Sequence, residues 1–493
     1  MRVVEESNAI DDMSAASEPR PAAESHRHAV VLGAGPAGLM AAWRLREAGY
    51  RVTVIDKATT VGGMCATLKF ATDDGDYYFD YGGHRFITKN PKLLAFVDEL
   101  MGETLLHAER KSVIRFQGRT YDYPLNLPNL LKNAPFSLLF GTLLDWLAMP
   151  FKRRIGKDEE CSFADWIENR FGKTLYRHFF EGYTRKLWGI EPDTLSADWA
   201  GQRISLIDLK DVVRRLWQRG PSTPRTYARK YRYPKLGFGQ IFDTLHQRLL
   251  EQGVEFVMGA EVSGLETQQQ RITAVRCRTA AGSEQQLACD EVIATLPLPQ
   301  ICHWLNIPCE LSYRALRFFN LPMQQQDVSD NTWQYLSDPG ILGTRLQEPR
   351  RRSPHMAPAG RTSLMFEIPC QQGDELWQAD NEALWPRIKA DMQRLGVDPT
   401  KADGRYFTAY CEHAYPIMEV GYQRQREAAI SALLRYPNLV MAGRQGTFRY
   451  IFTDTAMEMG LMAAEMLIEG VDRRRQIFDH RNENTVIETQ SVA

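Results

Sequence analysis

Three glycines in residues 33–38 and an acidic residue further along the chain have the types and spacing of a phosphate-binding turn. Gly33 permits a tight turn, Gly35 lets a pyrophosphate approach the main chain, and Gly38 lets a helix pack against the preceding strand. Asp56 comes at the distance at which a carboxylate accepts hydrogen bonds from a dinucleotide ribose. We therefore expect a dinucleotide to contact Gly33, Gly35, Pro36, Ala37, Gly38, Asp56 and Lys57.

A strand, a turn and a helix must position these residues. Residues 28–32 (HAVVL) form an apolar run typical of a buried strand, and residues 39–47 are mostly helix formers. Residues 51–55 (RVTVI) predict a second strand that ends at Asp56. The helix N-terminus would then face the phosphates, because its free N–H groups attract anions.

A glycine pair after Asp56 favours FAD over a nicotinamide cofactor. Gly62 and Gly63 resemble the extended dinucleotide signature of FAD proteins in the glutathione-reductase-like group, whereas a simple glycine turn is the alternative. The resemblance implies that FAD is the cofactor. It also implies further cofactor contacts from Gly62, Gly63, Met64, Gly83, His84, Val262, Gly443, Arg444, Thr455, Ala456 and Met457.

Later segments complete the same domain. Residues 254–266 and 291–297 are typical of strands, and residues 438–444 predict a strand near the C-terminal end of the chain. A helix over residues 455–468 is expected to follow, because these residues are mostly helix formers and Thr453 and Asp454 precede them as capping residues.

Residues 80–86 (DYGGHRF) resemble the loop that passes the flavin ring in the amine-oxidase-like and protoporphyrinogen-oxidase-like flavoproteins and in the UDP-galactopyranose mutases. The glycine pair permits a close approach of the main chain. His84 falls on the flavin-adjacent histidine of the mutases. The alternative is a histidine with a structural role only.

Two further segments resemble the substrate side of the mutases. Residues 183–189 (YTRKLWG) resemble a helical motif whose tryptophan, here Trp188, stacks near the nucleotide or sugar. A core tryptophan is the equal alternative, since this residue type is often largely buried. Arg314 resembles the arginine that reaches the diphosphate of the mutase substrate, and the planar guanidinium fits phosphate oxygens.

The C-terminal third carries the most specific part of the resemblance. Residues 414–417 (AYPI) and 438–450 (NLVMAGRQGTFRY) resemble the closing motif of the mutases. There Arg444 would lie by the flavin, where a cation stabilises a reduced, anionic ring. A surface salt bridge is the alternative for this residue. Phe448 and Phe452 depart from the mutase pattern, because each stands where a polar residue is common.

The resemblance therefore implies a small set of working residues. His84 and Arg444 are the expected catalytic side chains, with flavin N5 as the main reactive atom. No metal site is expected. Expected substrate contacts are Tyr183, Trp188, Arg314, Tyr415, Arg449 and Tyr450.

The composition excludes several other classes. With 44% hydrophobic and 25% charged residues, the 493-residue chain matches a globular protein of two or three domains. The 60 Lys and Arg residues balance 61 Asp and Glu residues, so no nucleic-acid partner is expected. The eight cysteines form no CxxC pair, which favours reduced thiols in the cytoplasm. No hydrolase motif such as GxSxG is present.

Two segments raise the question of partners. Residues 136–151 are the most apolar stretch and precede three basic residues. A buried helix is the favoured interpretation, and a one-sided membrane contact is the alternative.

Residues 214–235 hold eight Lys and Arg residues and no acid. Tyrosines such as Tyr231 and Tyr233 in this segment would offer ring faces to an anionic ligand. A solvated loop is the alternative. The oligomeric state, monomer or homodimer, stays open.

The predicted fold is α/β. A glutathione-reductase-like Rossmann FAD domain is expected over residues 28–110, 225–310 and 405–471, with a mixed α/β substrate domain inserted over residues 111–224 and 311–404. Residues 1–27 and 472–493 are expected to be tails.

Three functions follow from this reading. The favoured one is an FAD-dependent oxidoreductase that takes a hydride at flavin N5 from a small substrate, for which an anion is the candidate. The second is a nucleotide-sugar isomerase that, like the mutases it resembles, uses reduced FAD without net oxidation. The third is a flavin-binding protein without turnover.

Overall fold

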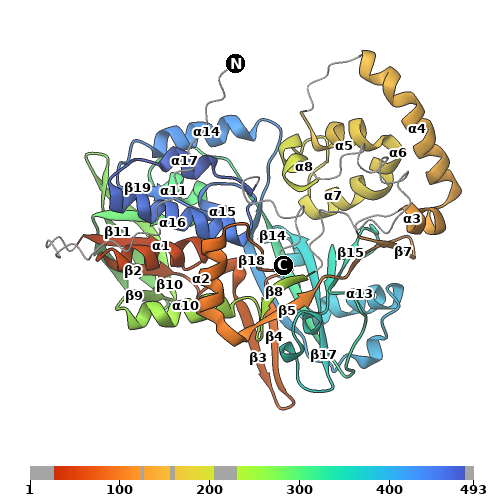
Figure 1. Ribbon diagram of the computed structural model, residues 1–493, viewed down its shortest axis with the longest axis horizontal. Coiled ribbons are helices and arrows are strands. Elements are labelled where there is room, and N and C mark those ends of the chain that lie inside the picture. The colour runs from red at the N-terminus through yellow and green to blue at the C-terminus, as the bar shows by residue number, and fades with distance from the viewer. Residues whose placement is uncertain (1–26, 124–126, 156–160, 205–229, 483–493) are drawn as a thin grey trace.

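A computed structural model describes residues 27–123, 127–155, 161–204 and 230–482 (Figure 1). The expected N-terminal tail up to residue 26 and residues 214–229 of the expected basic loop lie outside these ranges. The expected C-terminal tail is described up to residue 482, and there it is not frayed: α17 (Arg474–Asp479) buries Ile477 and Phe478, because these apolar side chains cover the core.

A five-stranded parallel sheet forms one half of the molecule, which confirms the predicted α/β fold. Its strands follow the order β19-β13-β1-β2-β9, and every neighbouring pair is parallel. Three separate stretches of sequence therefore lie side by side. The strands are β1 (His28–Leu32), β2 (Arg51–Asp56), β9 (Glu255–Met258), β13 (Glu291–Ala294) and β19 (Leu439–Met441).

The predicted strand 254–266 is in fact two strands. Gly259 breaks it with φ +70°, a conformation that favours glycine. β9 then stays in the parallel sheet, while β10 (Ala260–Gln268) forms a three-stranded antiparallel sheet with β11 (Arg271–Thr279) and β12 (Glu284–Ala288).

Helices cover the parallel sheet, and two of them pack unusually closely. α1 (Pro36–Glu47) begins three residues earlier than predicted, at a proline whose fixed φ suits the first helical turn. α16 (Thr453–Glu469) lies against it, and a Cβ at Gly460 would be 2.1 Å from the carbonyl oxygen of Ala37. The other helices here are α2 (Pro91–Met101), α10 (Gln240–Glu251), α11 (Leu298–Trp304), α14 (Tyr422–Leu433) and α15 (Gly443–Gly446).

A seven-stranded mixed sheet forms the second half, in the order β18-β14-β17-β16-β15-β6-β7. Every residue of the two strands β14 and β17 is buried. The first strand in the order, β18, comes from the segment 405–471 that the sequence analysis gave wholly to the other domain. The strands are β6 (Ser112–Phe116), β7 (Arg119–Asp122), β14 (Tyr313–Met323), β15 (Trp333–Leu336), β16 (Arg345–Gln347), β17 (Thr362–Cys370) and β18 (Phe407–Pro416).

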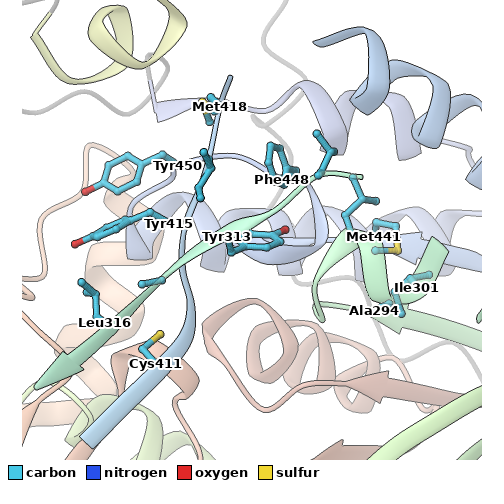
Figure 2. Packing of buried hydrophobic residues seen from close by; sticks show 14 of the residues in the cluster. Ala294, Ile301, Tyr313, Leu316, Cys411, Tyr415, Met418, Met441, Phe448 and Tyr450 are labelled. Carbon is cyan, nitrogen blue, oxygen red and sulfur yellow. The ribbon is translucent and has the colours of Figure 1, made fainter. Parts of the chain in front are cut away.

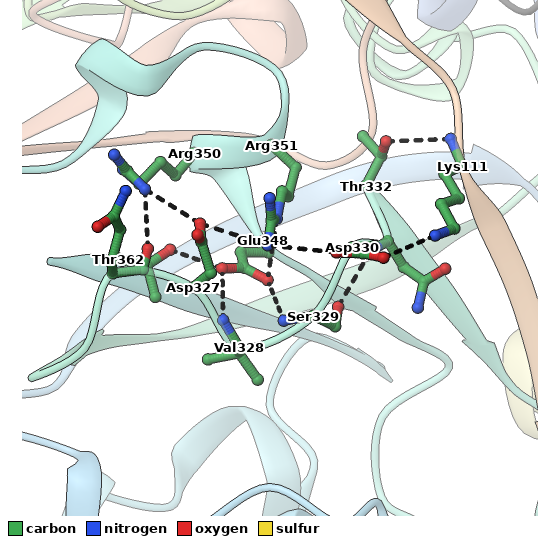
Figure 3. Close-up of polar contacts among 12 residues, drawn as sticks. Lys111, Asp327, Val328, Ser329, Asp330, Thr332, Glu348, Arg350, Arg351 and Thr362 are labelled. Carbon is green, nitrogen blue, oxygen red and sulfur yellow. Dashed lines mark hydrogen bonds and ion pairs between the residues drawn. The ribbon is translucent and has the colours of Figure 1, made fainter. Parts of the chain in front are cut away.

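A buried carboxylate fixes the loop between β14 and β15 (Figure 3). Glu348 accepts hydrogen bonds from the N–H groups of Val328 and Ser329, each at 2.9 Å, and from the hydroxyl of Thr362 at 2.9 Å. Burial raises the pKa of Glu348 above its ordinary value. Because Glu348 directly follows β16, these bonds also hold that short strand in place.

Two small antiparallel sheets of two strands each lie between the halves, and helices complete the mixed sheet. β3 (Thr67–Thr72) pairs with β4 (Gly75–Asp80), and β5 (Leu105–Glu109) pairs with β8 (Lys230–Pro234). Tyr231 and Tyr233 on β8 are buried, so they offer no ring face to a ligand, contrary to expectation, because they pack into the core beneath α2 and α10. The helices α12 (Glu375–Gln378) and α13 (Asn381–Arg394) lie beside this sheet.

A group of helices stands at the outer end of the mixed sheet (Figure 1). Its outermost member, α4, is not buried as the sequence analysis favoured: several of its large apolar side chains are exposed. Among the described residues, no helix combines the length and apolar character needed to cross a membrane. The group contains α3 (Leu127–Asn133), α4 (Phe136–Ile155), α5 (Phe163–Phe171), α6 (Lys173–Leu175), the π-helix Tyr176–Glu181, α7 (Gly182–Trp188) and α8 (Ala197–Ile204).

Candidate functional site

A cavity of about 800 Å³ runs along the carboxyl ends of the parallel strands β1, β2, β13 and β19. In open α/β sheets this edge is where ligands bind. Its far wall comes from β18 of the mixed sheet. The sequence-predicted residues that line it are Gly33, Gly35, Pro36, Ala37, Asp56, Lys57, Gly63, Met64, His84, Val262, Gly443, Arg444 and Ala456. Five other predicted cofactor residues lie outside the lining: Gly38, Gly62, Gly83, Thr455 and Met457.

Two glycines of the phosphate-binding turn differ in the space around them. A Cβ at Gly35 would meet no atom within 4 Å, whereas a Cβ at Gly38 would lie 2.0 Å from the carbonyl oxygen of Gly33. Gly38 therefore serves the packing of α1 on β1. Gly35 is the N-cap of α1 and supplies no side chain to cap it. The free N–H groups at this end can donate hydrogen bonds to a phosphate.

Asp56 lies at the end of β2, opposite that turn. Its Oδ2 accepts from the N–H of Ala34 at 2.7 Å, and its Oδ1 accepts from the N–H of Ala58 at 2.8 Å. Burial raises the pKa of Asp56, and these two hydrogen bonds oppose the rise. At the cavity wall, Lys57 forms an ion pair with Glu412 of β18. Sequence reasoning missed Glu412, because nothing in the sequence places β18 across from β2.

His84 stands at the other end of the cavity. Its Nε2–H donates to the carbonyl of Tyr81 at 2.9 Å, and its Nδ1 lies 4.0 Å from the sulfur of Cys65. The ring stacks on Phe238 with the centroids 5.3 Å apart. Burial lowers the pKa of His84 to about 4. The imidazole is therefore neutral near pH 7, with one nitrogen held by the main chain.

Arg444 reaches the same end of the cavity from the N-terminal turn of α15. Its Nη2 donates to the carbonyl of Ile451 at 2.7 Å, and its Nη1 donates to the carbonyl of Ala414 at 3.2 Å. The guanidinium carbon lies 4.8 Å from the ring centre of Tyr450. Among the described residues no carboxylate forms an ion pair with Arg444. The structure therefore shows no surface salt bridge there, which was the alternative to a role of Arg444 beside the flavin.

Three of the predicted substrate residues meet in an aromatic cluster beside Arg444. The centroid of Trp188 lies 5.8 Å from that of Tyr415, which lies 5.8 Å from that of Tyr450. Figure 2 shows the two tyrosines side by side, with their hydroxyls pointing the same way. Trp199 of α8 closes the cluster, 4.5 Å from Trp188. The rings pack on each other and do not line the large cavity.

Arg314 lies beneath the end of α7. Its Nε donates to the carbonyl of Leu187 at 3.0 Å, and its Nη1 would be 2.7 Å from a Cβ at Gly189. Burial lowers the pKa of this guanidinium. No described carboxylate forms an ion pair with it. α7 is itself tied to the mixed sheet by Lys186, which donates to four main-chain carbonyls, those of Leu336, Asp338, Ile341 and Gly343, at 2.6–3.1 Å.

The two remaining predicted substrate residues lie apart from each other. Tyr183, on α7, has its ring centre 6.5 Å from that of Tyr335 on β15. Arg449 faces α17, where its Nε donates to the carbonyl of Phe478 at 2.7 Å. The structure therefore connects Arg449 to the C-terminal helix α17.

Sequence reasoning missed a buried polar network under the loop 80–86. Arg345 of β16 and Glu367 of β17 are paired in register and form an ion pair at 2.6 Å. Arg345 also donates to the hydroxyl of Tyr415 at 2.7 Å. Gln347 donates to Glu367 and accepts from Arg352, which forms no ion pair with a described carboxylate. The only available signal was a single acid, Glu367, within the apolar run of β17.

This network touches the glycine pair directly. A Cβ at Gly82 would lie 3.3 Å from Oε1 of Glu367, and a Cβ at Gly83 would lie 3.4 Å from Oε1 of Gln347. Burial raises the pKa of Glu367, and the neighbouring Arg345 opposes the rise. The network thus connects the main chain beside His84 to the hydroxyl of Tyr415.

Comparisons with known proteins identify relatives of the chain. The Klebsiella pneumoniae protein named "Probable UDP-galactopyranose mutase" is 22% identical over 455 residues, which cover 92% of this chain and 98% of that protein. The coproporphyrinogen III oxidase of Propionibacterium freudenreichii subsp. freudenreichii is 27% identical over 197 residues, or 38% of this chain and 36% of that protein. A crystal structure of reduced UDP-galactopyranose mutase superposes with a TM-score of 0.77 at 19% identity and covers 92% of this chain and 97% of that one.

The family model described as "Flavin containing amine oxidoreductase" matches residues 36–468. This range begins at α1 and ends within α16. It includes the mixed sheet, every strand of the parallel sheet except β1, and most of the residues that line the cavity. The predicted resemblance to the amine-oxidase-like flavoproteins and the mutases is confirmed. The chain belongs to the flavin-containing amine oxidoreductase family.

Proposed function

We propose that the protein is an FAD-dependent enzyme that isomerises a nucleotide sugar with the flavin in its reduced state. The observation that carries this proposal is the set of cations without carboxylate partners around the loop 80–86 and the aromatic cluster. The relative named as a UDP-galactopyranose mutase, which the chain matches over 98% of its length, supports the same choice. This reverses the order of the first two functions expected from the sequence alone.

The residues at the cavity fit FAD. The uncapped N-terminus of α1 and the open position at Gly35 suit a pyrophosphate, and Asp56 suits the adenosine ribose. The cavity continues from there to His84 and Arg444, as a long dinucleotide requires. Bound FAD would supply the reactive N5 atom and the electrons that this chemistry needs. The cationic Arg444 would stabilise a negative charge on the reduced ring.

Charge favours a diphosphate over an amine as the substrate group. Arg314, Arg352 and Arg444 carry positive charge without an ion-pair partner among the described residues, and the charges of Arg345 and Glu367 cancel. The buried carboxylate Asp80, which accepts hydrogen bonds only from neutral groups, offsets one of the three cations and leaves a net positive charge. A protonated amine would be repelled by this surplus, and a diphosphate would be attracted. Arginine forks match phosphate oxygens in geometry as well as in charge.

The departures from the mutase pattern have a structural reason in one case. Phe448 is fully buried, with its ring centre 5.1 Å from that of Tyr313 and 6.0 Å from that of Tyr422. It is therefore a core residue here, packed against two aromatic rings. The hydroxyl of Tyr415, which accepts a hydrogen bond from Arg345, offers a polar contact at the aromatic cluster instead.

A second candidate is an oxidoreductase with an anionic substrate. The same surplus of positive charge would bind carboxylates, and the family and the coproporphyrinogen III oxidase among the relatives favour it. The two candidates differ in a direct way. A nucleotide-sugar isomerase binds the nucleotide diphosphate itself, whereas an oxidase of a carboxylate substrate gains nothing from a nucleotide.

Filling the open position at Gly35 is expected to abolish flavin binding. Gly35→Leu would place a side chain in the space before the N-terminus of α1, where the pyrophosphate is proposed to lie. The purified variant should lack the flavin absorbance of the wild type, with unchanged far-ultraviolet circular dichroism. The matched control is Ala48→Leu at the exposed C-terminal end of the same helix, which should keep its flavin. Full flavin occupancy in the Gly35 variant would contradict the proposed cofactor position.

Arg314→Gln is expected to weaken binding of UDP about tenfold to a hundredfold, since a charge-assisted hydrogen bond contributes about 1.5–3 kcal/mol. Isothermal titration calorimetry on the flavin-loaded protein gives the dissociation constant. Arg449→Gln serves as the control, because the structure directs Arg449 toward α17, and it should bind UDP like the wild type. Equal losses in both variants, or no UDP binding by the wild type, would count against the nucleotide-sugar assignment.

His84 is expected to make the protein acid-sensitive. Its pKa is about 4 in the folded protein against an ordinary value of 6.5, so the unfolded chain takes up the proton first as the pH falls. The corresponding stability, about 2 kcal/mol after allowance for solvent screening at the cavity, is present above pH 6.5 and lost toward pH 4. Urea unfolding across this range should show a smaller loss for His84→Gln than for the wild type. Parallel curves for the two proteins would show that His84 is not held neutral.

A further inference from the structure

An exposed apolar stripe runs along α4, the outermost helix of the molecule (Figure 1). Its side chains stand at positions i, i+4, i+7, i+8 and i+11, so they share one face of the helix. Phe136 is 81% exposed and Leu147 is 62% exposed, which is far more than a core-facing helix would show. The stripe consists of Phe136, Phe140, Leu143, Leu144 and Leu147.

The opposite face of α4 is fixed to the protein. Leu138 is buried in a cluster with Phe116, Tyr121 and Phe179. Asp145 accepts a hydrogen bond from the N–H of Thr174 at 2.6 Å, at the start of the short helix α6. The helix is therefore held with its stripe outward, and its one acid is engaged on the inner side.

Positive charge flanks the stripe at both ends. Exposed Lys132 comes four residues before Phe136, and the sequence places Lys152, Arg153 and Arg154 in the last turns of α4. Between Lys132 and Lys152 the only charged residue is Asp145. An uncharged apolar ridge between cations matches the layered chemistry of a bilayer surface, where acyl chains lie beside anionic phosphates.

We propose that α4 docks the protein on the surface of a membrane that contains anionic phospholipids. The stripe spans 12 residues, from Phe136 to Leu147, or about 16 Å along the helix axis. It lies parallel to the membrane with its five apolar side chains at the acyl boundary. Exposed Lys132 meets the phosphates at one end of the stripe, and the sequence places three more basic residues beyond the other end. The exposed apolar side chains lie on one face of the helix only, which indicates a helix that lies on the bilayer. This inference is independent of the proposed function.

A membrane fits the stripe better than a protein partner does. Phe136, Phe140 and Leu147 stand out from a convex helix at the edge of the molecule, and the stripe itself carries no hydrogen-bonding side chain. A protein interface of useful size would need polar groups around its rim. The charges here stand at the two ends of the stripe, as an interfacial helix requires.

Vesicle flotation of the flavin-loaded protein tests the proposal. The wild type should float with vesicles of phosphatidylcholine and phosphatidylglycerol, should float less with phosphatidylcholine alone, and should be released by salt. The double variant Phe140→Ser, Leu144→Ser should bind the anionic vesicles at least about tenfold more weakly than the wild type does. Its flavin content and thermal midpoint should match those of the wild type, because both side chains are exposed.

Leu250→Ser is the matched control, since Leu250 is an exposed leucine on α10, at the parallel-sheet half. It should float like the wild type. Three results would overturn the proposal: no flotation of the wild type with anionic vesicles, equal binding to both vesicle types, or undiminished binding by the double variant. Light scattering completes the test, since a wild-type dimer that becomes monomeric in the double variant, without vesicle binding, would assign the stripe to self-association.

Discussion

The close approach of α16 to α1 is the constraint on which the site depends. A side chain at Gly460 would collide with the carbonyl of Ala37, and a Cβ at Gly443 would lie 3.2 Å from the Cβ of Ala37. The two ends of the chain can therefore pack with their main chains nearly in contact. This packing carries Arg444 to the end of the cavity where His84 stands. Without it, the phosphate-binding turn and the flavin-adjacent residues would belong to unconnected surfaces.

The second physical feature is an excess of buried positive charge on the substrate side. Desolvating a guanidinium is costly unless something compensates it, and Arg314 and Arg352 have only neutral groups as hydrogen-bond partners among the described residues. A protein keeps such an arrangement when an anion completes it. The reduced flavin and a diphosphate are the two anions that the proposed isomerase would bring together there.

The sequence predicted what depends on short-range spacing. The glycine turn, β1, β2 and the helix after them follow from residues within one segment, and the resemblance in residues 80–86 and 438–450 led to the family. Pairing across the mixed sheet could not be predicted in this way. Arg345 meets Glu367 only because β16 and β17 pair in one particular register. The apolar content of α4 also could not predict which face of this helix packs on the protein, because apolar side chains are compatible with a protein core and with a lipid surface.

The central claim is that reduced flavin in this protein rearranges a nucleotide sugar without net oxidation. The most direct test is to reduce the flavin-loaded protein with dithionite under anaerobic conditions, add UDP-galactopyranose, and separate the products by chromatography, with the oxidised protein as control. The account predicts the furanose isomer from the reduced protein only. The absence of isomer, together with flavin reduction by a carboxylate substrate under the same conditions, would contradict it and assign the protein to the oxidoreductases.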